Sequence, residues 1–314
     1  MKQDRITFID NAKTLATFLV IYCHLCSVWS NERLYVHAFH MPFFFFISGL
    51  LFEKKRERKE NLVKIVKGVI IPLFLYSVIG FIFNIAIGND VIYVLKSSVI
   101  GLINGSGFKI NEVCWFLIAL VWCKLIANEI INNPLKGIVL WVICCGAFMK
   151  NTLFIAQGCM AVPFFMFGYY AKNKIIEISK QSFLKYMWIF LFAISALITH
   201  FNGRVSMYAH SFGNLGLLSI VLFYLNGIIG SFGLISISLI SKTNHTFLTE
   251  YNKSMISAVG LQSIFITIFK NRFGLDNDII VNFITTIGIM LGCYGLHLII
   301  IKPITKFINS KLKI

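Results

Sequence analysis

The sequence predicts an all-α protein: a single integral membrane domain, residues 1–314, folded as a polytopic bundle of about ten transmembrane helices. The first observation is composition, since 57% of the residues are hydrophobic and only 13% are charged, with a mean hydropathy of +0.78. Soluble proteins carry about 25% charged residues. One aqueous core cannot bury this much apolar surface, so lipid is the expected solvent. No polar stretch is long enough to form a second, soluble domain.

The second observation is the spacing of the apolar stretches. A helix that spans a bilayer needs roughly 17–25 residues. Stretches near that length fall at 7–28, 36–52, 69–88, 113–131, 137–150, 153–171, 184–201, 213–240, 254–269 and 279–301, with a weaker one at 91–103. The 137–150 stretch is short and the 213–240 stretch is long, so the number of spans could differ from ten by one or two.

The third observation is the placement of basic residues. Seven Lys and Arg residues lie in 53–67, four lysines lie in 172–185, and four more follow residue 301. Cytoplasmic loops of membrane proteins are rich in Lys and Arg. Ten spans place these segments and the N-terminus on one side, so we expect a protein of the cell (inner) membrane with both termini cytoplasmic. The segments 29–36, 202–212 and 270–278 then face outward.

The same pattern explains the net charge of +16 without a nucleic-acid partner, because the basic residues flank apolar stretches. All eight cysteines lie within apolar stretches. We therefore expect them to pack as small hydrophobic residues and not to form a disulfide framework. The run Cys23-His24-Leu25-Cys26 has no second pair of soft ligands nearby, so no metal site is expected. The first apolar stretch lacks a small-residue cleavage site and is expected to be retained.

Ionisable residues inside a span are the main candidates for function, because each costs roughly 2.5–3.5 kcal/mol at mid-helix. The first span carries Asp10, Lys13 and His24. Lys13 and His24 are eleven residues apart, about three helical turns, so they share a face about 16 Å apart along the axis. Asp10 lies on the same face as Lys13. An ion pair that sets helix register and a packing histidine are the structural alternatives for these residues.

The second span begins with His40, Met41 and Pro42, followed by four phenylalanines. Pro42 suits the first turn of a helix, where its missing N–H costs nothing. His40 is either an interfacial anchor or a site residue. We expect the phenylalanines to face lipid or to pack, and Ser48 with Gly49 to allow close approach of another helix.

Four motifs give the chain a family resemblance. The runs IDNAKTLATFLVIYCH and FHMPFFFFISG, at 9–24 and 39–49, resemble the acyltransferase-3 family of multi-pass membrane acyltransferases, and most closely its fucose 4-O-acetylase-like branch. Lys64 and Lys67 before Pro72 resemble the basic run that precedes a proline in the family. CWFLIAL, with Trp115, is similar to another family block. The resemblance is strong over about residues 5–120, whereas KTNHTFLTEY at 242–251 matches a late block only loosely.

The resemblance implies transfer of an acyl group, usually acetyl from acetyl-CoA, to a hydroxyl of a surface glycan or its lipid-linked precursor. It makes His24 the essential histidine, acting as base or acyl acceptor, with His40 assisting. Lys13, Lys64 and Lys67 are then candidates to bind the donor's phosphates, while Asp10, Pro42, Ser48, Gly49 and Trp115 support the site. Thr14 and Phe43 depart from the usual glycine and leucine, and the late block lacks a histidine that many members carry, which leaves the acceptor open.

Two other functions remain compatible with the residues. A transporter or flippase of a glycan or small molecule would use the polar stripe of the first span to line a pathway. A non-catalytic scaffold of an envelope assembly would need no reactive group at all.

Overall fold

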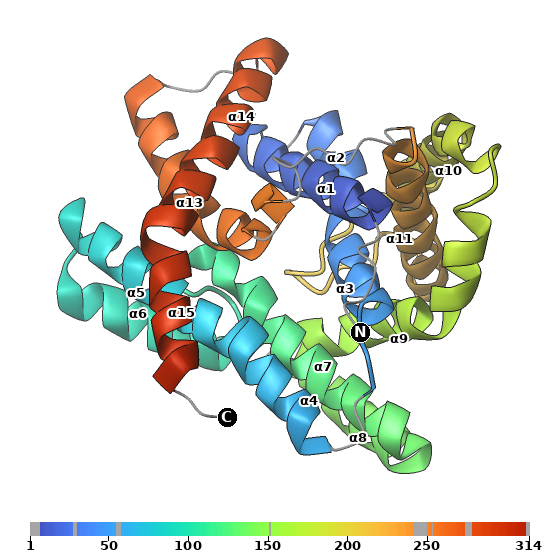
Figure 1. Ribbon diagram of the computed structural model, residues 1–314, viewed down its shortest axis with the longest axis horizontal. Helices are drawn as coiled ribbons and strands as arrows, with labels where there is room; N and C mark the ends of the chain where they lie inside the picture. The colour runs from blue at the N-terminus through green and yellow to red at the C-terminus, as the bar shows by residue number, and fades with distance from the viewer. Residues whose placement is uncertain are drawn as a thin grey trace.

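The described part of the chain consists mainly of helices joined by short loops (Figure 1). The computed structural model describes residues 7–27, 30–54, 58–150, 152–240, 250–252, 254–273 and 278–311. Residues 242–249 of the late block, 55–57 of the first basic segment and 312–314 of the last one lie outside them. The α-helices are α1 (Thr7–Leu25), α2 (Asn31–His37), α3 (His40–Leu50), α4 (Arg58–Ile65), α5 (Ile71–Ala86), α6 (Val91–Asn104), α7 (Trp115–Asn132), α8 (Pro134–Cys145), α9 (Ile155–Ile178), α10 (Trp188–Asn202), α11 (Leu217–Ser238), α13 (Met255–Phe273), α14 (Ile279–Leu296) and α15 (Lys302–Lys311).

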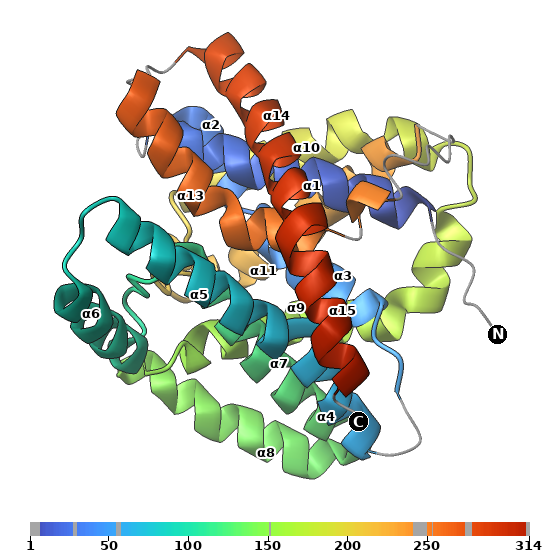
Figure 2. The same cartoon turned by 60° about the vertical axis from the view of Figure 1, so that its left-hand side comes forward.

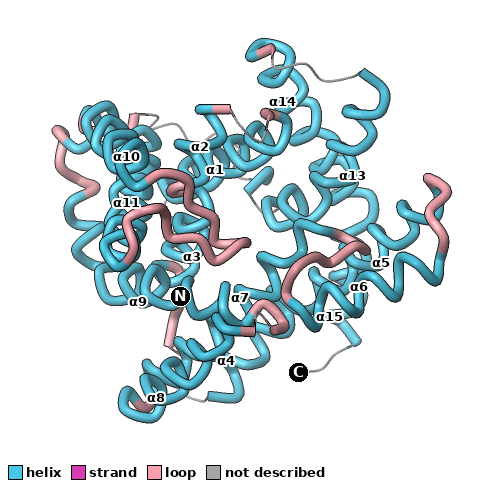
Figure 3. The backbone as a smooth tube through the Cα atoms, turned by 180° about the vertical axis from the view of Figure 1, so that it is seen from behind, coloured by secondary structure: helices cyan, strands magenta, loops and turns pink. Residues whose placement is uncertain are grey.

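Short π- and 3-10 segments extend several of these helices. The π-segments are η1 (Val66–Ile70), which joins α4 to α5, and η5 (His297–Ile301), which joins α14 to α15; the 3-10 segments are η2 (Glu112–Cys114), η3 (Gly146–Met149) and η4 (Leu184–Tyr186). Figure 2 shows α14, η5 and α15 as one continuous rod. In Figure 3 helix fills almost the whole tube, and loops only connect one helix to the next.

Among the described residues, four helical runs are long and apolar enough to cross a membrane: Lys59–Ala86, Glu112–Asn132, Leu217–Ser238 and Ile279–Ile308. Four further apolar helices are shorter, and they include α6, with fourteen residues. At 1.5 Å per residue α6 is about 21 Å long, less than the roughly 30 Å of a hydrocarbon core. Asp90 caps its first turn and Gly105, in the left-handed region, ends it.

The apolar stretch 36–52 does not form one helix, in contrast to the prediction. It divides into the end of α2 and the eleven-residue α3, with Ala38 and Phe39 between them. Pro42 explains the break, because a residue without an N–H cannot donate to the carbonyl of Ala38. At about 16 Å, α3 is too short to span a bilayer alone.

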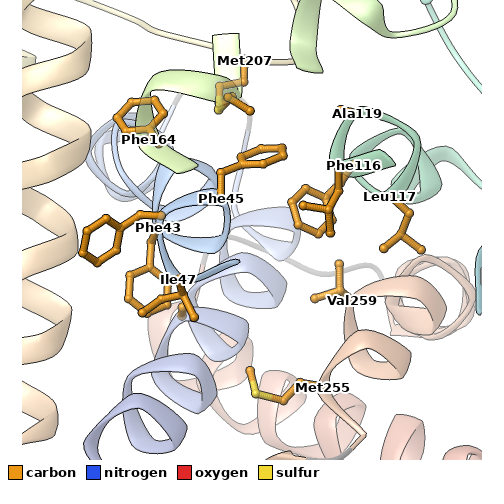
Figure 4. Close-up of a cluster of buried hydrophobic side chains, with 14 of the residues drawn as sticks. Phe43, Phe45, Ile47, Phe116, Leu117, Ala119, Phe164, Met207, Met255 and Val259 are labelled. Atoms are coloured by element: carbon orange, nitrogen blue, oxygen red, sulfur yellow. The ribbon is translucent and has the colours of Figure 1, made fainter. Parts of the chain in front are cut away.

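The phenylalanine run forms the centre of the core and not a lipid-facing surface. Phe43, Phe45 and Phe46 are fully buried. The Phe45 ring meets Phe116 of α7 edge to face, with 5.1 Å between ring centroids. Figure 4 shows the Phe45 and Phe116 side chains between α3 and α7. Burial of three aromatic rings makes α3 a central element of the bundle.

Two glycines bring α3 and α9 into backbone contact. A Cβ atom on Gly49 would lie 1.9 Å from the carbonyl oxygen of Phe165, and one on Gly168 would lie 2.1 Å from that of Phe46. These glycines allow the two helices to pack at van der Waals distance, as the Ser48-Gly49 pair predicts.

The eight cysteines are free, and six of them are buried, as the sequence predicts.

On the far side of the bundle, Asn111 joins α5 to α13. Its Nδ2 donates to the carbonyls of Tyr76 and Gly260 at 3.2 and 2.8 Å, and its Oδ1 accepts from the Ser263 hydroxyl at 3.0 Å.

Candidate functional site

Helix α1 carries an ion pair near its beginning. The Lys13 ammonium lies 2.8 Å from the Asp10 carboxylate, and both side chains are mostly buried, with 21% and 13% of their surface exposed. The pair is one turn apart on α1, as the spacing predicts. Asp10 thus balances the charge of Lys13, while the ammonium keeps further N–H donors that a second acceptor such as a phosphate could use.

The other end of α1 carries His24, close to His40 of α3. The two helices pack together, and the imidazoles lie within electrostatic range of each other. His24 is partly exposed, whereas His40 is only 4% exposed. The structure thus brings together two histidines that are sixteen positions apart in the sequence.

A hydrogen bond fixes the tautomer of His40. Its Nδ1 lies 2.8 Å from the carbonyl oxygen of Val36. A carbonyl can only accept, so Nδ1 carries the proton and Nε2 of the neutral ring has a free lone pair. A neutral His40 can therefore accept a proton or the hydrogen bond of a hydroxyl at Nε2. It cannot donate there to an oxyanion.

A third histidine, absent from the sequence-based candidates, lies beside these two. The His37 ring stacks at a tilt on His40, with centroids 4.8 Å apart. Its Nε2 is buried and finds no hydrogen-bond partner among the described residues. The sequence feature that could have identified His37 is its position three residues before His40. One helical turn places residues at this spacing on the same side.

Positive charge surrounds the three histidines, which we call the histidine cluster (His24, His37 and His40). Arg33 lies one turn before His37 on α2, and Arg204 follows α10, which packs against α2. Burial lowers the pKa of Arg33, and the nearby charge of Arg204 lowers it further, against the opposing effect of Cys23. Lys270 of α13 also lies within electrostatic range of His24.

The lysines predicted to bind the donor differ in their partners and exposure. Lys13 pairs with Asp10, whereas Lys64 pairs with Glu53 at 3.5 Å in an exposed contact. Lys67 is partly buried within η1, between α4 and α5. Lys13 and Lys64 therefore have different carboxylate partners.

Lys124 of α7 is a cation that the sequence-based candidates missed. It is partly buried inside a spanning helix and lies within electrostatic range of Lys64. A hydrogen bond of 3.0 Å from Asn61 Nδ2 to Asn128 Oδ1 holds α4 against this part of α7. The sequence feature that could have identified Lys124 is its charge inside the apolar stretch 113–131, because such a charge is costly in lipid.

The other residues predicted to support the site lie in α3 and at the start of α7. Pro42 is buried in the first turn of α3, and Gly49 contacts α9 near the other end of that helix, with Ser48 beside it and partly buried. Trp115 begins α7, and its ring lies edge to face with Tyr208, with centroids 5.5 Å apart. Tyr208 belongs to the loop that also carries Arg204.

The described residues thus form a bundle of helices with an ion pair near one end of its first helix and clustered imidazoles near the other. Comparison with known proteins identifies the family. The model of the acyltransferase-3 family, described as an acyltransferase domain, matches residues 6–311, and the chain belongs to this family. No curated protein and no solved structure matches the chain.

Proposed function

We propose that this protein is an O-acetyltransferase that moves an acetyl group from acetyl-CoA to a hydroxyl of a cell-surface polysaccharide or its lipid-linked precursor. The family supports the transfer of an acyl group. The resemblance of 9–24 and 39–49 to the fucose 4-O-acetylase-like branch supports acetyl as the group and a sugar as the acceptor. We further propose about ten spans in the cell (inner) membrane, with both termini cytoplasmic, on the basis of the basic segments.

One observation carries the proposal: α1 holds a buried cation and an imidazole eleven residues apart. Coenzyme A is a long, thin donor with a polyanionic nucleotide end. In the proposed arrangement Lys13, with Lys64 and Lys67, attracts the phosphates on the cytoplasmic side. The pantetheine arm then runs along α1, over a length comparable to the 16 Å between Lys13 and His24. The thioester reaches the histidine cluster at the far end.

The chemistry at that end follows from the histidines. A sugar hydroxyl is a poor nucleophile until a base removes its proton, and imidazole is suited to this near neutral pH. In the proposed mechanism His24 acts as this base or accepts the acyl group itself. His40 accepts a hydrogen bond from the acceptor at Nε2 and so orients it. Coenzyme A leaves as the thiol once the acetyl carbonyl is bonded to the sugar oxygen.

The test uses purified protein in liposomes, acetyl-CoA labelled in the acetyl group, and lipid-linked glycan from cells that lack the protein. Wild-type protein is expected to transfer label to the glycan. His24→Ala, inserted at the same level, is expected to lose transfer, whereas His200→Ala, at an exposed histidine of α10, keeps it. Failure of the wild type to transfer label, or full activity of His24→Ala, would contradict the proposal.

The same liposomes test the alternative of a transporter. Movement of unlabelled glycan across the membrane without acetyl transfer, and unaffected by His24→Ala, would favour a flippase. Mass spectrometry of surface glycan from cells with and without the protein gives an independent readout. A difference of one acetyl unit would establish both the donor and the class of acceptor.

A further inference from the structure

A cavity of about 310 Å³ lies apart from the histidine cluster, between α5, the loop before α7 and α13. Its wall combines an aromatic ring, Phe83, with polar side chains that include Asn89, Glu112 and Thr267. Ligand pockets in proteins begin at about 300 Å³. The volume therefore suits one small ring and not an acyl-CoA or a lipid chain.

The wall is held rigid by side-chain amides. Asn84 Nδ2 donates to the carbonyls of Gly80 and Ile110 at 2.8 and 3.1 Å, which ties the loop to α5. Asn89 Nδ2 donates to Asn84 Oδ1 at 3.0 Å. A pocket whose backbone is fixed in this way loses little conformational entropy when a ligand binds.

The wall also offers hydrogen-bonding atoms to a ligand. Among the described residues, none donates to Asn89 Oδ1, and none bonds to the Thr267 hydroxyl. Glu112 pairs with Lys109 at 3.5 Å, and 70% of the Glu112 side chain is exposed. The one cation and the one anion of the wall thus neutralise each other, so an uncharged ligand with several hydroxyls fits better than an anion.

Helix α13 links the cavity to the surroundings of the histidine cluster. Thr267 lines it, and Lys270, one turn further along α13, lies within electrostatic range of His24 and Arg33. On the other side, burial and then the charge of Glu112 raise the pKa of Tyr208, whose ring contacts Trp115. A glycan that extends from His24 along α13 as far as Thr267 would therefore reach the cavity.

We propose that this cavity binds an uncharged pyranose ring of the acceptor glycan, next to the sugar that is acetylated. The ring stacks on Phe83 through its C–H face, while its hydroxyls bond to Thr267, Asn89 and Glu112. This inference rests on the proposed function for the identity of the ligand as an acceptor, but sugar binding itself is measured without acetyl transfer.

The test measures binding of methyl glycosides of glucose, galactose, fucose and N-acetylglucosamine to the protein in nanodiscs by saturation-transfer NMR. Glucuronate and inorganic phosphate serve as anionic probes. At least one neutral glycoside is expected to bind. Thr267→Val and Glu112→Gln, which keep side-chain shape, are each expected to weaken it by about tenfold. The matched controls Thr152→Val and Glu60→Gln lie outside the cavity and should leave binding unchanged.

His24→Ala separates this inference from the proposed function. This substitution is expected to abolish acetyl transfer and to leave glycoside binding intact. The proposed function and the further inference can therefore fail independently. Binding that persists unchanged in both cavity variants would overturn the inference, as would binding of phosphate or glucuronate alone, or of no probe at all.

Discussion

At the scale of single residues, the hydrogen bond between His40 and Val36 decides what each histidine can do. With Nδ1–H committed to a carbonyl at 2.8 Å, the neutral ring has one reactive atom, Nε2. His24 has no such constraint among the hydrogen bonds of the described residues. The two imidazoles are therefore suited to different roles, His40 to orienting an acceptor and His24 to the proton transfer or the covalent step.

Replacing His40 by asparagine tests the role of Nε2. The asparagine amide can donate to the Val36 carbonyl as Nδ1 does, but no atom replaces Nε2. We expect acetyl transfer to fall by about 100-fold, the lower range for loss of a positioned acid or base, with little change in melting temperature. His40→Gln, which places an amide near Nε2, should retain more activity. Equal activity of the asparagine variant and the wild type would contradict this role.

Replacing Lys13 tests the donor end of α1. Lys13→Met is expected to raise the KM for acetyl-CoA by about tenfold, because a charge-assisted contact to phosphate is lost. Lys13→Arg should largely restore it. Lys136→Met is the matched control, since Lys136 is an exposed lysine of α8 outside the proposed donor site. A KM that is unchanged in Lys13→Met, or raised equally in both methionine variants, would argue against a specific contact.

At the scale of elements, α3 is positioned by its contact with α9. Gly49 and Gly168 each lie against a carbonyl of the opposite helix. Side chains larger than hydrogen do not fit there, so the backbones, and not interdigitated side chains, set the spacing. His40 is on the same short helix as Gly49, and its distance from α1 depends on this packing.

Substitution of Gly49 by alanine should be destabilising. A Cβ 1.9 Å from the Phe165 carbonyl oxygen forces the helices apart. Overpacking of this kind costs about 1–3 kcal/mol, which should appear as a lower melting temperature in detergent, together with reduced activity. Gly68→Ala is the control, because nothing lies within 4 Å of its added Cβ. A stability loss in Gly68→Ala equal to that in Gly49→Ala would show that the contact is not the cause.

Asn111 has the corresponding role on the far side of the bundle, between α5 and α13. Its amide bonds to two backbone carbonyls and one hydroxyl. Asn111→Leu leaves these buried groups without a partner, so we expect a loss of about 2–4 kcal/mol in stability. Asn104→Leu, at an exposed position of α6, is the control for thermal unfolding. An unchanged melting temperature in Asn111→Leu would refute the role of this amide.

At the scale of the whole molecule, the fold class followed from composition, because no aqueous core could bury so much apolar surface. Helix boundaries were harder to predict. The stretch 36–52 is continuously apolar, yet Pro42 ends the hydrogen-bond ladder within it, and only the proline indicated where α3 begins. Periodicity placed Lys13 and His24 on one helix, but contacts between helices, such as that of His37 with His40, are not encoded in local pattern.

The missed cations have a similar explanation. Arg33 and Arg204 lie in or beside segments that were expected to face outward, where charge is unremarkable. Lys124 was within an apolar stretch, and its cost there should have marked it. Ion pairs also divided the predicted lysines, since the partner of Lys64 is Glu53 and not a residue of α1.

The orientation of the whole bundle is testable with reporter fusions. Alkaline phosphatase folds into an active enzyme only outside the cytoplasm. Fused after residue 210 it is expected to be active, and after residue 180 inactive, because the segment 172–185 carries four lysines. A cytoplasmic fluorescent reporter should give the opposite pattern at the two sites. Phosphatase activity after residue 180 would reverse the proposed topology.

The paired glycines have a consequence for how the molecule opens. The backbones of α3 and α9 are already in contact, so these helices cannot tilt apart without losing that contact. They therefore form a rigid pair. Entry of a bulky donor or sugar would then require displacement of other helices, because Gly49 and Gly168 hold these two together.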